Sequence, residues 1–171
     1  MADLRIDHAD WLLTLDRDRR ILTNGTVAVA EGRIVAVGKT ADVAAAHPAP
    51  HVISARGKVI TPGLIDSHIH TTFQLSRGLA DEVSSKAFLF ERMYPYEAAL
   101  DEADALASIR LCVLELVKNG VTTFIDAGNY QPHLTAEVAG AAGLRCVVAR
   151  SSFDVAASAM GVLPPSFIET T

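Results

Sequence analysis

The sequence predicts an α/β protein in which a small β region precedes the opening units of a (β/α)8 TIM-like barrel. In residues 1–60, apolar and polar positions alternate in short runs, a pattern typical of strands. After Thr61, strand and helix patterns alternate, and a β-α-β-α-β order implies a parallel sheet with right-handed crossovers. The sequence ends at residue 171, whereas a complete barrel takes about 250 residues, so we expect an incomplete barrel with three of its eight units.

Composition limits the class of partner. Hydrophobic residues make up 50% of the chain, which is enough for a globular core. The net charge of −5 leaves no basic surface for nucleic acid or for an anionic membrane, so we expect a small-molecule partner. The charged start "MADLRID" and the lack of any run of about 18 apolar residues favour a cytoplasmic protein without a leader or membrane span. Cys112 and Cys146 lack CxxC spacing and are expected to be reduced core residues.

The first sixty residues contain the signals of a small sheet with short connections. Strands at Val27–Ala30 and Arg33–Val37 are joined across Glu31-Gly32, where glycine allows the positive φ of a tight hairpin. The stretches "DWLLTLD" and "RRILTNG" predict a second strand pair, and "HVISARGKVIT" predicts a third around Arg56-Gly57. Between them, "TADVAAAHPAP" is expected to form one helical turn that ends at Pro48.

The second half begins with "LIDSHIH", a short apolar strand that leads into the long polar connection "TTFQLSRGLADEVSS". A helical stretch over Lys86–Tyr94 follows, and then a clear helix in "DEADALASIRLCVLELVKNG", with Asp101 as its cap and Asn119-Gly120 as its stop. The remaining elements are the strand "VTTFID", a helix over Pro132–Ala142 and the strand "LRCVVA". The final "GVLPPSFIETT" is expected to be a connection with no element after it.

Two histidines stand one residue apart at the end of the first strand of this half. Side chains at i and i+2 of a strand point to the same face, so His68 and His70 project together and can share an ion. Neutral imidazole is a usual ligand for zinc and also suits iron. The C-terminal end of a parallel strand is also where barrel enzymes keep their active sites. The spacing alone leaves a second interpretation open, in which the two histidines are merely exposed or hydrogen-bonded at a strand end.

The context of this pair resembles a known family. The stretch "VITPGLIDSHIH" is similar to the strand-one metal motif of the amidohydrolase superfamily, and "GRIVAVG" resembles a hairpin of that family's small β-sandwich. The stretches "RGLADE", "YPYEAAL" and "VKNGVTTFIDAG" resemble the branch of cytosine, guanine and S-adenosylhomocysteine/methylthioadenosine deaminases and triazine hydrolases. The resemblance covers nearly the whole chain. It implies an N-terminal β-sandwich portion at residues 1–60 and the first three β/α units of a metal-dependent hydrolase barrel at residues 61–171.

The resemblance also implies roles for single residues. His68 and His70 match the two strand-one ligands of a divalent metal, with zinc expected and iron as the alternative. Family members complete the site from strands five, six and eight, which this sequence does not reach. In "YPYE", Glu97 aligns with an acidic residue that faces the sugar in nucleoside-deaminating members; the alternative is a solvated residue at a helix start. Tyr94 and Tyr96 stand where those members more often have Trp and Leu, which leaves the substrate open.

Other candidates lie near the ends of the later strands. His133 and Arg150 are candidate substrate-binding residues, with a surface or helix-start position as the alternative for His133. Asp126 is expected to form hydrogen bonds in the loop at its strand end rather than to act on a substrate. The histidines of the small β region are expected to be structural: His8, His47 and His51.

The resemblance implies a metal-dependent hydrolase of C–N bonds that deaminates or hydrolyses a purine, pyrimidine, triazine or related ring by means of metal-activated water. The alternative is a truncated, non-catalytic fragment that binds metal weakly or associates with other chains. Because the later-strand catalytic residues are not in the sequence, we expect the 171-residue chain to have no turnover alone. The expected partner is a small heterocyclic substrate, and an unpaired strand edge leaves a homo-oligomer open.

Overall fold

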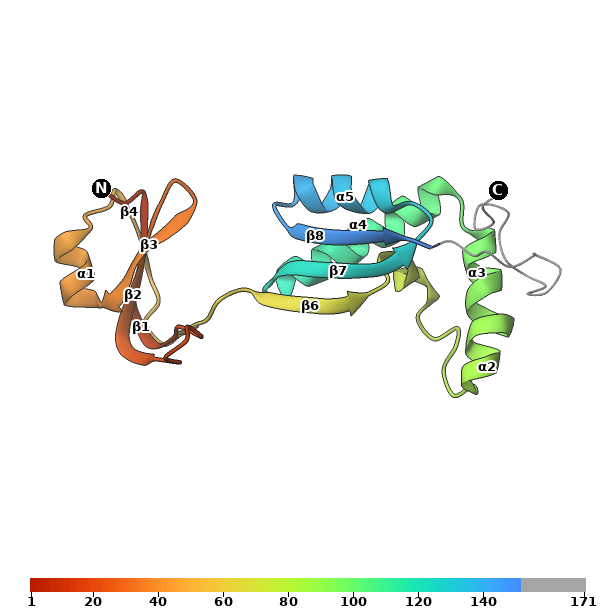
Figure 1. Cartoon of the computed structure of the whole chain (residues 1–171), viewed down its shortest axis with the longest axis horizontal. Coiled ribbons are helices and arrows are strands. Elements are labelled where there is room, and N and C mark those ends of the chain that lie inside the picture. The colour runs from red at the N-terminus through yellow and green to blue at the C-terminus, as the bar shows by residue number, and fades with distance from the viewer. Residues whose placement is uncertain (152–171) are drawn as a thin grey trace. The chain divides into compact units, whose positions relative to one another are not determined.

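The chain divides into two compact units, Met1–Pro62 and Gly63–Thr171 (Figure 1). The structure is a computed structural model that describes residues 1–151, so the predicted connection "GVLPPSFIETT" lies outside the described residues. No helix within residues 1–151 is long and apolar enough to cross a membrane.

The first unit is a five-stranded sheet with one helix. Its strands run in the order β3-β2-β1-β4, and β5 also pairs with β1. The pairs β1–β2 and β2–β3 are antiparallel, whereas β4 and β5 both run parallel to β1. The elements are β1 (Leu4–Leu13), β2 (Ile21–Ala30), β3 (Arg33–Lys39), α1 (Thr40–Ala46), β4 (His51–Ser54) and β5 (Val59–Ile60).

The turn between β2 and β3 confirms the predicted hairpin. Glu31 and Gly32 both have positive φ, at 50° and 71°, which is the backbone of the tight turn whose twist matches two antiparallel strands. The predicted pairing of "DWLLTLD" with "RRILTNG" is also confirmed, as β1 and β2.

The predicted strand pair within "HVISARGKVIT" is wrong. Its two halves form β4 and β5, but both pair with β1 and not with each other. The turn at Gly57 does not reverse the chain, because the Lys58 N–H bonds to the Ala55 carbonyl at 3.0 Å and the Lys58 carbonyl then accepts the Asp10 N–H of β1 at 3.0 Å. The chain therefore makes one short turn between β4 and β5, and both strands pair with the same edge of β1.

A polar pair lies inside this first unit, beside its apolar core. Asp7 is 4% exposed and accepts hydrogen bonds from Arg5 at 2.8 Å and from the buried hydroxyl of Thr26 at 3.1 Å. Arg5 also donates to the carbonyls of Ala44 and His47, at the end of α1. The Arg5–Asp7 pair thus ties β1 to β2 and to the helix. The apolar core beside it is formed by Ala9, Leu12, Val27 and Ala55.

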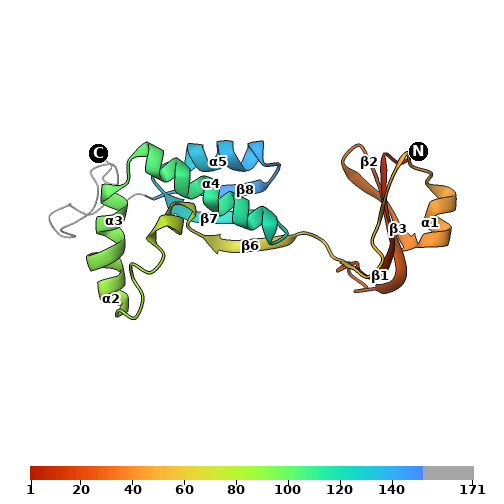
Figure 2. The ribbon, with the colours of Figure 1, turned by 180° about the vertical axis from the view of Figure 1, so that it is seen from behind.

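The second unit is a parallel three-stranded sheet in the order β6-β7-β8. Figures 1 and 2 show α4 and α5 on the same face of this sheet, and residues of both helices share one core with Phe124 of β7. The strands and these helices are β6 (Leu64–Ile69), α4 (Glu102–Lys118), β7 (Val121–Asn129), α5 (Pro132–Ala141) and β8 (Arg145–Arg150).

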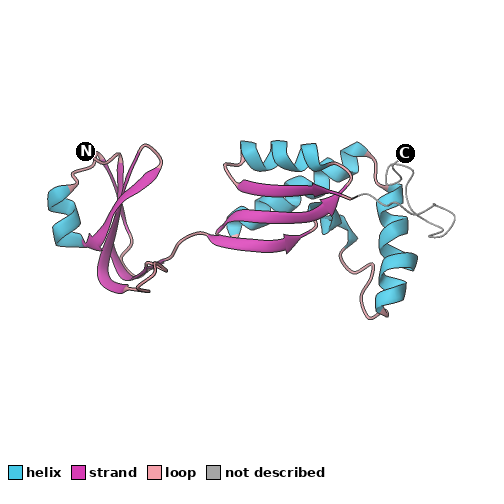
Figure 3. Cartoon of the chain, in the orientation of Figure 1, coloured by secondary structure: helices cyan, strands magenta, loops and turns pink. Residues whose placement is uncertain are grey.

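The connection between β6 and α4 is largely helical, as the secondary-structure colouring of Figure 3 shows. It starts with the 3₁₀ helix η1 (Thr71–Ser76). A continuous run of α2 (Ser85–Ala87), the π-helical η2 (Phe88–Met93) and α3 (Tyr94–Ala99) follows. The predicted helix over Lys86–Tyr94 is therefore confirmed but extends further. Pro95 does not end it, because Met93 and Tyr94 before it both keep helical backbone angles and the run continues from η2 into α3.

Helix α4 has the predicted ends. The Asp101 side chain accepts the Asp104 N–H at 2.8 Å and Asp104 returns a bond to the Asp101 N–H, which forms a capping box. The helix ends at Asn119, and Gly120 follows with φ of 77°. On the apolar face of α4, Ile109, Val113 and Leu116 are buried and Leu106 is partly buried, whereas Val117 is 46% exposed.

The sheet of the second unit is open in the described residues. The face of the sheet opposite α4 and α5 carries apolar side chains that no described residue covers. Ile65, Ile125 and Val147 on this face are 69, 38 and 60% exposed. A three-stranded open sheet with this apolar face is consistent with an incomplete barrel, whose interior is normally filled by such side chains.

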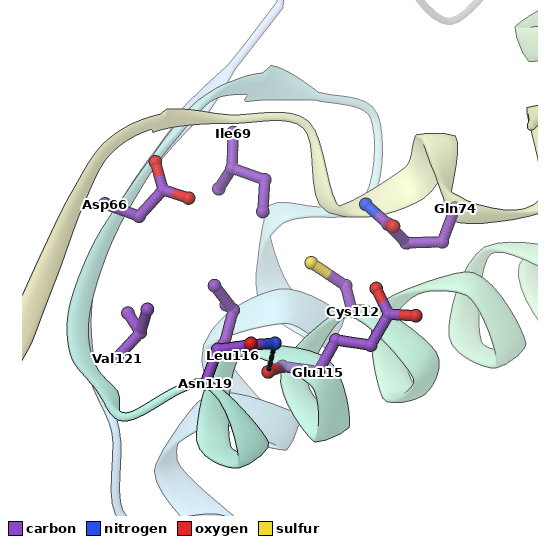
Figure 4. Close-up of a pocket in the computed structure, with 8 residues that line it drawn as sticks. All are labelled: Asp66, Ile69, Gln74, Cys112, Glu115, Leu116, Asn119 and Val121. Atoms are coloured by element: carbon purple, nitrogen blue, oxygen red, sulfur yellow. Dashed lines mark hydrogen bonds between the residues drawn. The ribbon is translucent and has the colours of Figure 1, made fainter.

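A groove of about 210 Å³ lies on the helix side of β6. Figure 4 shows Asp66 and Ile69 of β6 facing Cys112 and Glu115 of α4 across it. Burial raises the pKa of Cys112 to about 12, so this thiol stays protonated, and both cysteines are free, as predicted.

We expect Asp7→Asn to destabilise the first unit by roughly 2 kcal/mol at neutral pH, because it removes the charged partner of a buried hydrogen-bonded pair. The hydrogen bond from Arg5 holds the pKa of Asp7 below its usual value, so the pair stabilises the fold above the ordinary carboxyl pKa. This stabilisation is lost as the pH falls through the lower folded-state pKa. The measurement is amide hydrogen exchange in β1–β3 of both proteins across this pH range.

The exposed Asp18, changed to Asn, is the matched control and should leave exchange unchanged. Equal protection of Asp7→Asn and the unmodified protein at neutral pH would contradict the role given to the pair.

Candidate metal and substrate pocket

The two histidines of "SHIH" lie at the C-terminal end of β6. His68 belongs to the strand and His70 is the cap residue of η1, directly after it. Their ring centroids are 5.2 Å apart and the rings are nearly perpendicular, at 80°. Both line one pocket of about 380 Å³, so their i, i+2 spacing brings them to the same cavity.

Residues from several elements close this pocket. Glu97 of α3 lies in its lining with the two histidines, and Gly128 and Ser151 come from the ends of β7 and β8. The rest of the wall is aromatic or aliphatic and includes Phe73, Phe88, Leu89, Met93 and Tyr94. A few polar groups among apolar walls are the usual composition of a small-molecule site.

The orientation of His70 is set by a backbone carbonyl. Its Nδ1 lies 3.0 Å from the Gly128 oxygen. Because a carbonyl can only accept, Nδ1 must carry the proton, and the lone pair of Nε2 is left for a ligand. The ring also stacks on Phe73, with centroids 4.8 Å apart and 18° between the planes. A hydrogen bond to the distal nitrogen is the usual support of a metal-ligating histidine.

Gly128 was not among the residues that the sequence pointed to. Its φ is 147°, and a Cβ there would come within 2.5 Å of the Ser151 hydroxyl oxygen. Only glycine therefore fits this turn without strain. The signal in the sequence is its place, two residues after Asp126 at the end of a buried strand that runs beside β6.

Glu97 is buried, with 7% of its surface exposed, so the alternative of a solvated helix-start residue is wrong. Burial raises the pKa of Glu97 to about 7, and a hydrogen bond from the Tyr130 hydroxyl, 3.1 Å from Oε2, opposes this rise. The partner comes from the loop after β7, and sequence reasoning missed it because the two residues are 33 positions apart. Near neutral pH this carboxyl can accept or donate a hydrogen bond in the pocket.

The structure does not bring the other two candidates into this pocket. His133 is exposed in the first turn of α5, which packs on the helix side of the sheet. Arg150 is exposed at the end of β8. Alternation along that strand places Arg150 on the same side as Cys146, which packs against the helices. Asp126 is fully buried and hydrogen-bonded, as expected for a residue that organises a strand end.

The two histidines are a candidate for part of a metal site. Within residues 1–151, no group of three or more His, Cys, Asp or Glu side chains could hold a metal ion. Two imidazoles at a strand end, one with its Nδ1 bonded to a carbonyl, still fit the nitrogen donors that zinc prefers. The arrangement can therefore provide two ligands of a site and an apolar pocket beside them.

Comparison with protein-family models gives two matches. Residues 59–167 match the model described as Amidohydrolase family. Residues 27–49 match the model described as Imidazolonepropionase-like composite domain, bacteria.

Curated relatives match most of the chain but are much longer. A 5-methylthioadenosine/S-adenosylhomocysteine deaminase of Syntrophobacter fumaroxidans is 38% identical over 153 residues, which cover 90% of this chain and 34% of the relative. A 5'-deoxyadenosine deaminase of Methanosarcina acetivorans is 35% identical over 155 residues, covering 91% of this chain and 34% of the relative. The chain thus spans about a third of the length of these relatives.

Solved structures of similar fold include an adenosine deaminase from Xanthomonas campestris with bound zinc. Its TM-score is 0.85 and its sequence identity is 25%, and the match covers 96% of this chain and 37% of that one. A triazine hydrolase from Arthrobacter aurescens has a TM-score of 0.83 at 24% identity, covering 99% of this chain and 40% of that one, and shows likeness of fold alone.

We expect Tyr130→Phe to raise the pKa of Glu97 above 7, because it removes the hydrogen bond that opposes the effect of burial. The pKa of Glu97 in the unmodified protein should be measured first, from the pH dependence of its carboxyl ¹³C signal. The signal is assigned by its loss in Glu97→Gln. Since the folded-state pKa is raised, ionisation of Glu97 should lower stability as the pH rises from about 4.5 to about 7.

Tyr96→Phe is the matched control, because the Tyr96 hydroxyl donates to the Thr72 carbonyl and not to Glu97. A Glu97 pKa that moves equally in both variants would show that the Tyr130 hydroxyl has no particular effect.

Proposed function

The chain belongs to the amidohydrolase family, and from this premise we propose that His68 and His70 hold a divalent metal, with zinc expected, in a hydrolase that cleaves C–N bonds. The observation that carries the proposal is the single pocket that holds both imidazoles and the buried carboxyl of Glu97. The reaction class is supported by relatives named as deaminases.

The choice of zinc has two supports. The His70 hydrogen bond to Gly128 leaves Nε2 as the free donor, and imidazole nitrogen suits zinc, with iron as the alternative. The adenosine deaminase from Xanthomonas campestris is described with bound zinc. When bound, such an ion supplies hydroxide at neutral pH by lowering the pKa of a coordinated water.

The substrate that we propose is a purine nucleoside or a related adenosine derivative. Phe73, Phe88 and Met93 give the pocket an apolar lining that suits a heterocyclic ring. Glu97 would bind a polar group of the substrate, since its carboxyl is buried and can hydrogen-bond to hydroxyls. The two curated relatives described above are both named as deaminases of adenosine derivatives, which favours this class over triazines.

A second candidate is a non-catalytic polypeptide that binds metal weakly or associates with other chains. Two observations favour it: residues 1–151 contain no third metal-ligating group beside the two histidines, and β6 and β8 are both edge strands there.

We expect a chimera to separate these candidates. Residues 1–151 of this chain would replace the matching segment of the Syntrophobacter fumaroxidans deaminase. The chimera should deaminate 5'-methylthioadenosine when supplied with zinc. His68→Ala or His70→Ala should lower kcat/KM by roughly 100-fold or more, because each removes a ligand. His51→Ala, an exposed histidine of β4, is the matched control and should retain full activity.

A folded chimera without turnover, or one in which His68→Ala remains active, would contradict the catalytic proposal. The 171-residue chain alone should show no turnover in the same assay.

A separate prediction concerns zinc binding by the 171-residue chain. Two imidazoles fill only two of the four positions that zinc usually has, so affinity should be weak, in the range of about 1–100 μM. Calorimetric titration of metal-free protein should give one site per chain that is lost in His68→Ala and in His70→Ala and kept in His51→Ala. Binding that survives both pocket substitutions would place the ion elsewhere.

A further inference from the structure

We propose that Asp126 is a positioning residue that fixes the imidazole of His70 through the backbone of Gly128. The inference rests on the proposed function, since it assigns a purpose to the geometry of a metal-ligating histidine. Asp126 does not line the pocket, so its effect must pass through other groups.

Asp126 is the centre of a buried polar cluster that joins three segments. Thr71 begins η1, Asp126 and Asn129 end β7, and Thr135 lies in α5; all four are 0% exposed. The Asp126 Oδ2 accepts the Thr71 hydroxyl at 2.5 Å and the Asn129 amide at 2.5 Å. The Thr71 and Thr135 hydroxyl oxygens are 2.9 Å apart. Because the single Thr71 proton goes to Asp126, Thr135 is the donor of this last bond.

The other carboxylate oxygen reaches the histidine indirectly. Asp126 Oδ1 accepts the Gly128 N–H at 3.2 Å, and the Gly128 carbonyl accepts the proton of His70 Nδ1 at 3.0 Å. A glycine at φ of 147° has wide conformational freedom, so its carbonyl direction depends on such partners. Asp126 therefore restrains the chain on both sides of the glycine: Oδ1 holds the peptide before it through the Gly128 N–H, and Oδ2 holds Asn129, whose backbone shares the next peptide with the Gly128 carbonyl.

The same carboxylate also holds the backbone next to His70. Thr71 is the residue that follows His70, and both its N–H, at 3.4 Å, and its hydroxyl point to Asp126 Oδ2. Asp126 thus restrains the histidine from two sides, through the main chain of its neighbour and through the carbonyl that receives its ring proton. Metal ligands tolerate displacements of about 0.5 Å, and loss of such supporting groups typically costs 10–100-fold in metal affinity.

Packing alone does not account for this arrangement. Buried apolar residues would join η1, β7 and α5 without the cost of desolvating a carboxylate. Three donors have to be satisfied here: the Thr71 hydroxyl and the Asn129 amide bond to Oδ2, and the Gly128 N–H bonds to Oδ1. Only a side chain with two acceptor oxygens can do this. The carboxylate is therefore needed for the direction of the Gly128 peptide.

The test compares Asp126→Asn with Thr135→Val in the 171-residue chain. Asparagine keeps the shape but offers one acceptor oxygen, so either the Gly128 N–H or the Thr71 and Asn129 donors lose their partner. Thr135→Val removes hydrogen bonds from the same buried cluster but none on the path through Gly128. It therefore controls for a general loss of stability, which thermal unfolding of both variants records.

The first measurement is the tautomer of His70, read from the ¹⁵N shifts of its ring nitrogens in metal-free protein in alkaline buffer. The unmodified chain and Thr135→Val should show the Nδ1–H form, whereas Asp126→Asn should show a mixture of both forms. The second is zinc affinity, which should fall by about 10–100-fold in Asp126→Asn and by less than about twofold in Thr135→Val.

An unchanged tautomer in Asp126→Asn would overturn the proposal, and so would equal changes in both variants. If Asp126→Asn does not fold, Gly128→Ala tests the same path, since its Cβ would press on Ser151 and turn the carbonyl away; the Nδ1–H form should then be lost. Because the tautomer is read without metal, a chain that binds no zinc would refute the proposed function and leave this test valid.

Discussion

The hydrogen bond from His70 to the Gly128 carbonyl joins the ends of two neighbouring parallel strands, and the geometry of the pocket depends on it. Parallel pairing brings the carboxyl ends of β6 and β7 to one edge of the sheet, but pairing alone does not fix a side chain that lies beyond the last ladder bond. The carbonyl settles which ring nitrogen carries the proton. The stacked ring of Phe73 then limits rotation of the imidazole.

Short-range signals in the sequence were sufficient for several elements. The Glu31-Gly32 turn and the Asp101 cap depend on residues within four positions of each other, and both occur as expected. The pairing of β4 and β5 could not be found in this way. Their partner is β1, and the paired residues Leu4 and His51 are 47 positions apart. Which strand pairs with the free edge of β1 is decided by the folded sheet and not by a local turn signal.

The candidate site shows the same division between local and distant information. The spacing of His68 and His70 was enough to place them together, because strand geometry repeats every two residues. The hydrogen bond to Glu97 comes from Tyr130, 33 positions away, and the support of His70 comes from Gly128, 58 positions away. Neither partner has a spacing relation to the residue that it serves, so pattern alone could not identify them. For His133 and Arg150, position near a strand end was too weak a criterion, because it does not say which side of the sheet a side chain faces.

The metal-ligand candidates and most of the apolar wall come from different segments of the chain. His68 and His70 belong to the end of β6, whereas Phe88, Met93 and Glu97 belong to the helical run from Ser85 to Ala99. Substitutions at Phe88 or Met93 would reshape the cavity, whereas Tyr96 of the same run packs on the Phe73 ring that stacks on His70. Under the proposed function, a change of substrate could therefore arise in this run while both imidazoles are kept. In laboratory evolution, Phe88, Leu89 and Met93 would be the residues to randomise first.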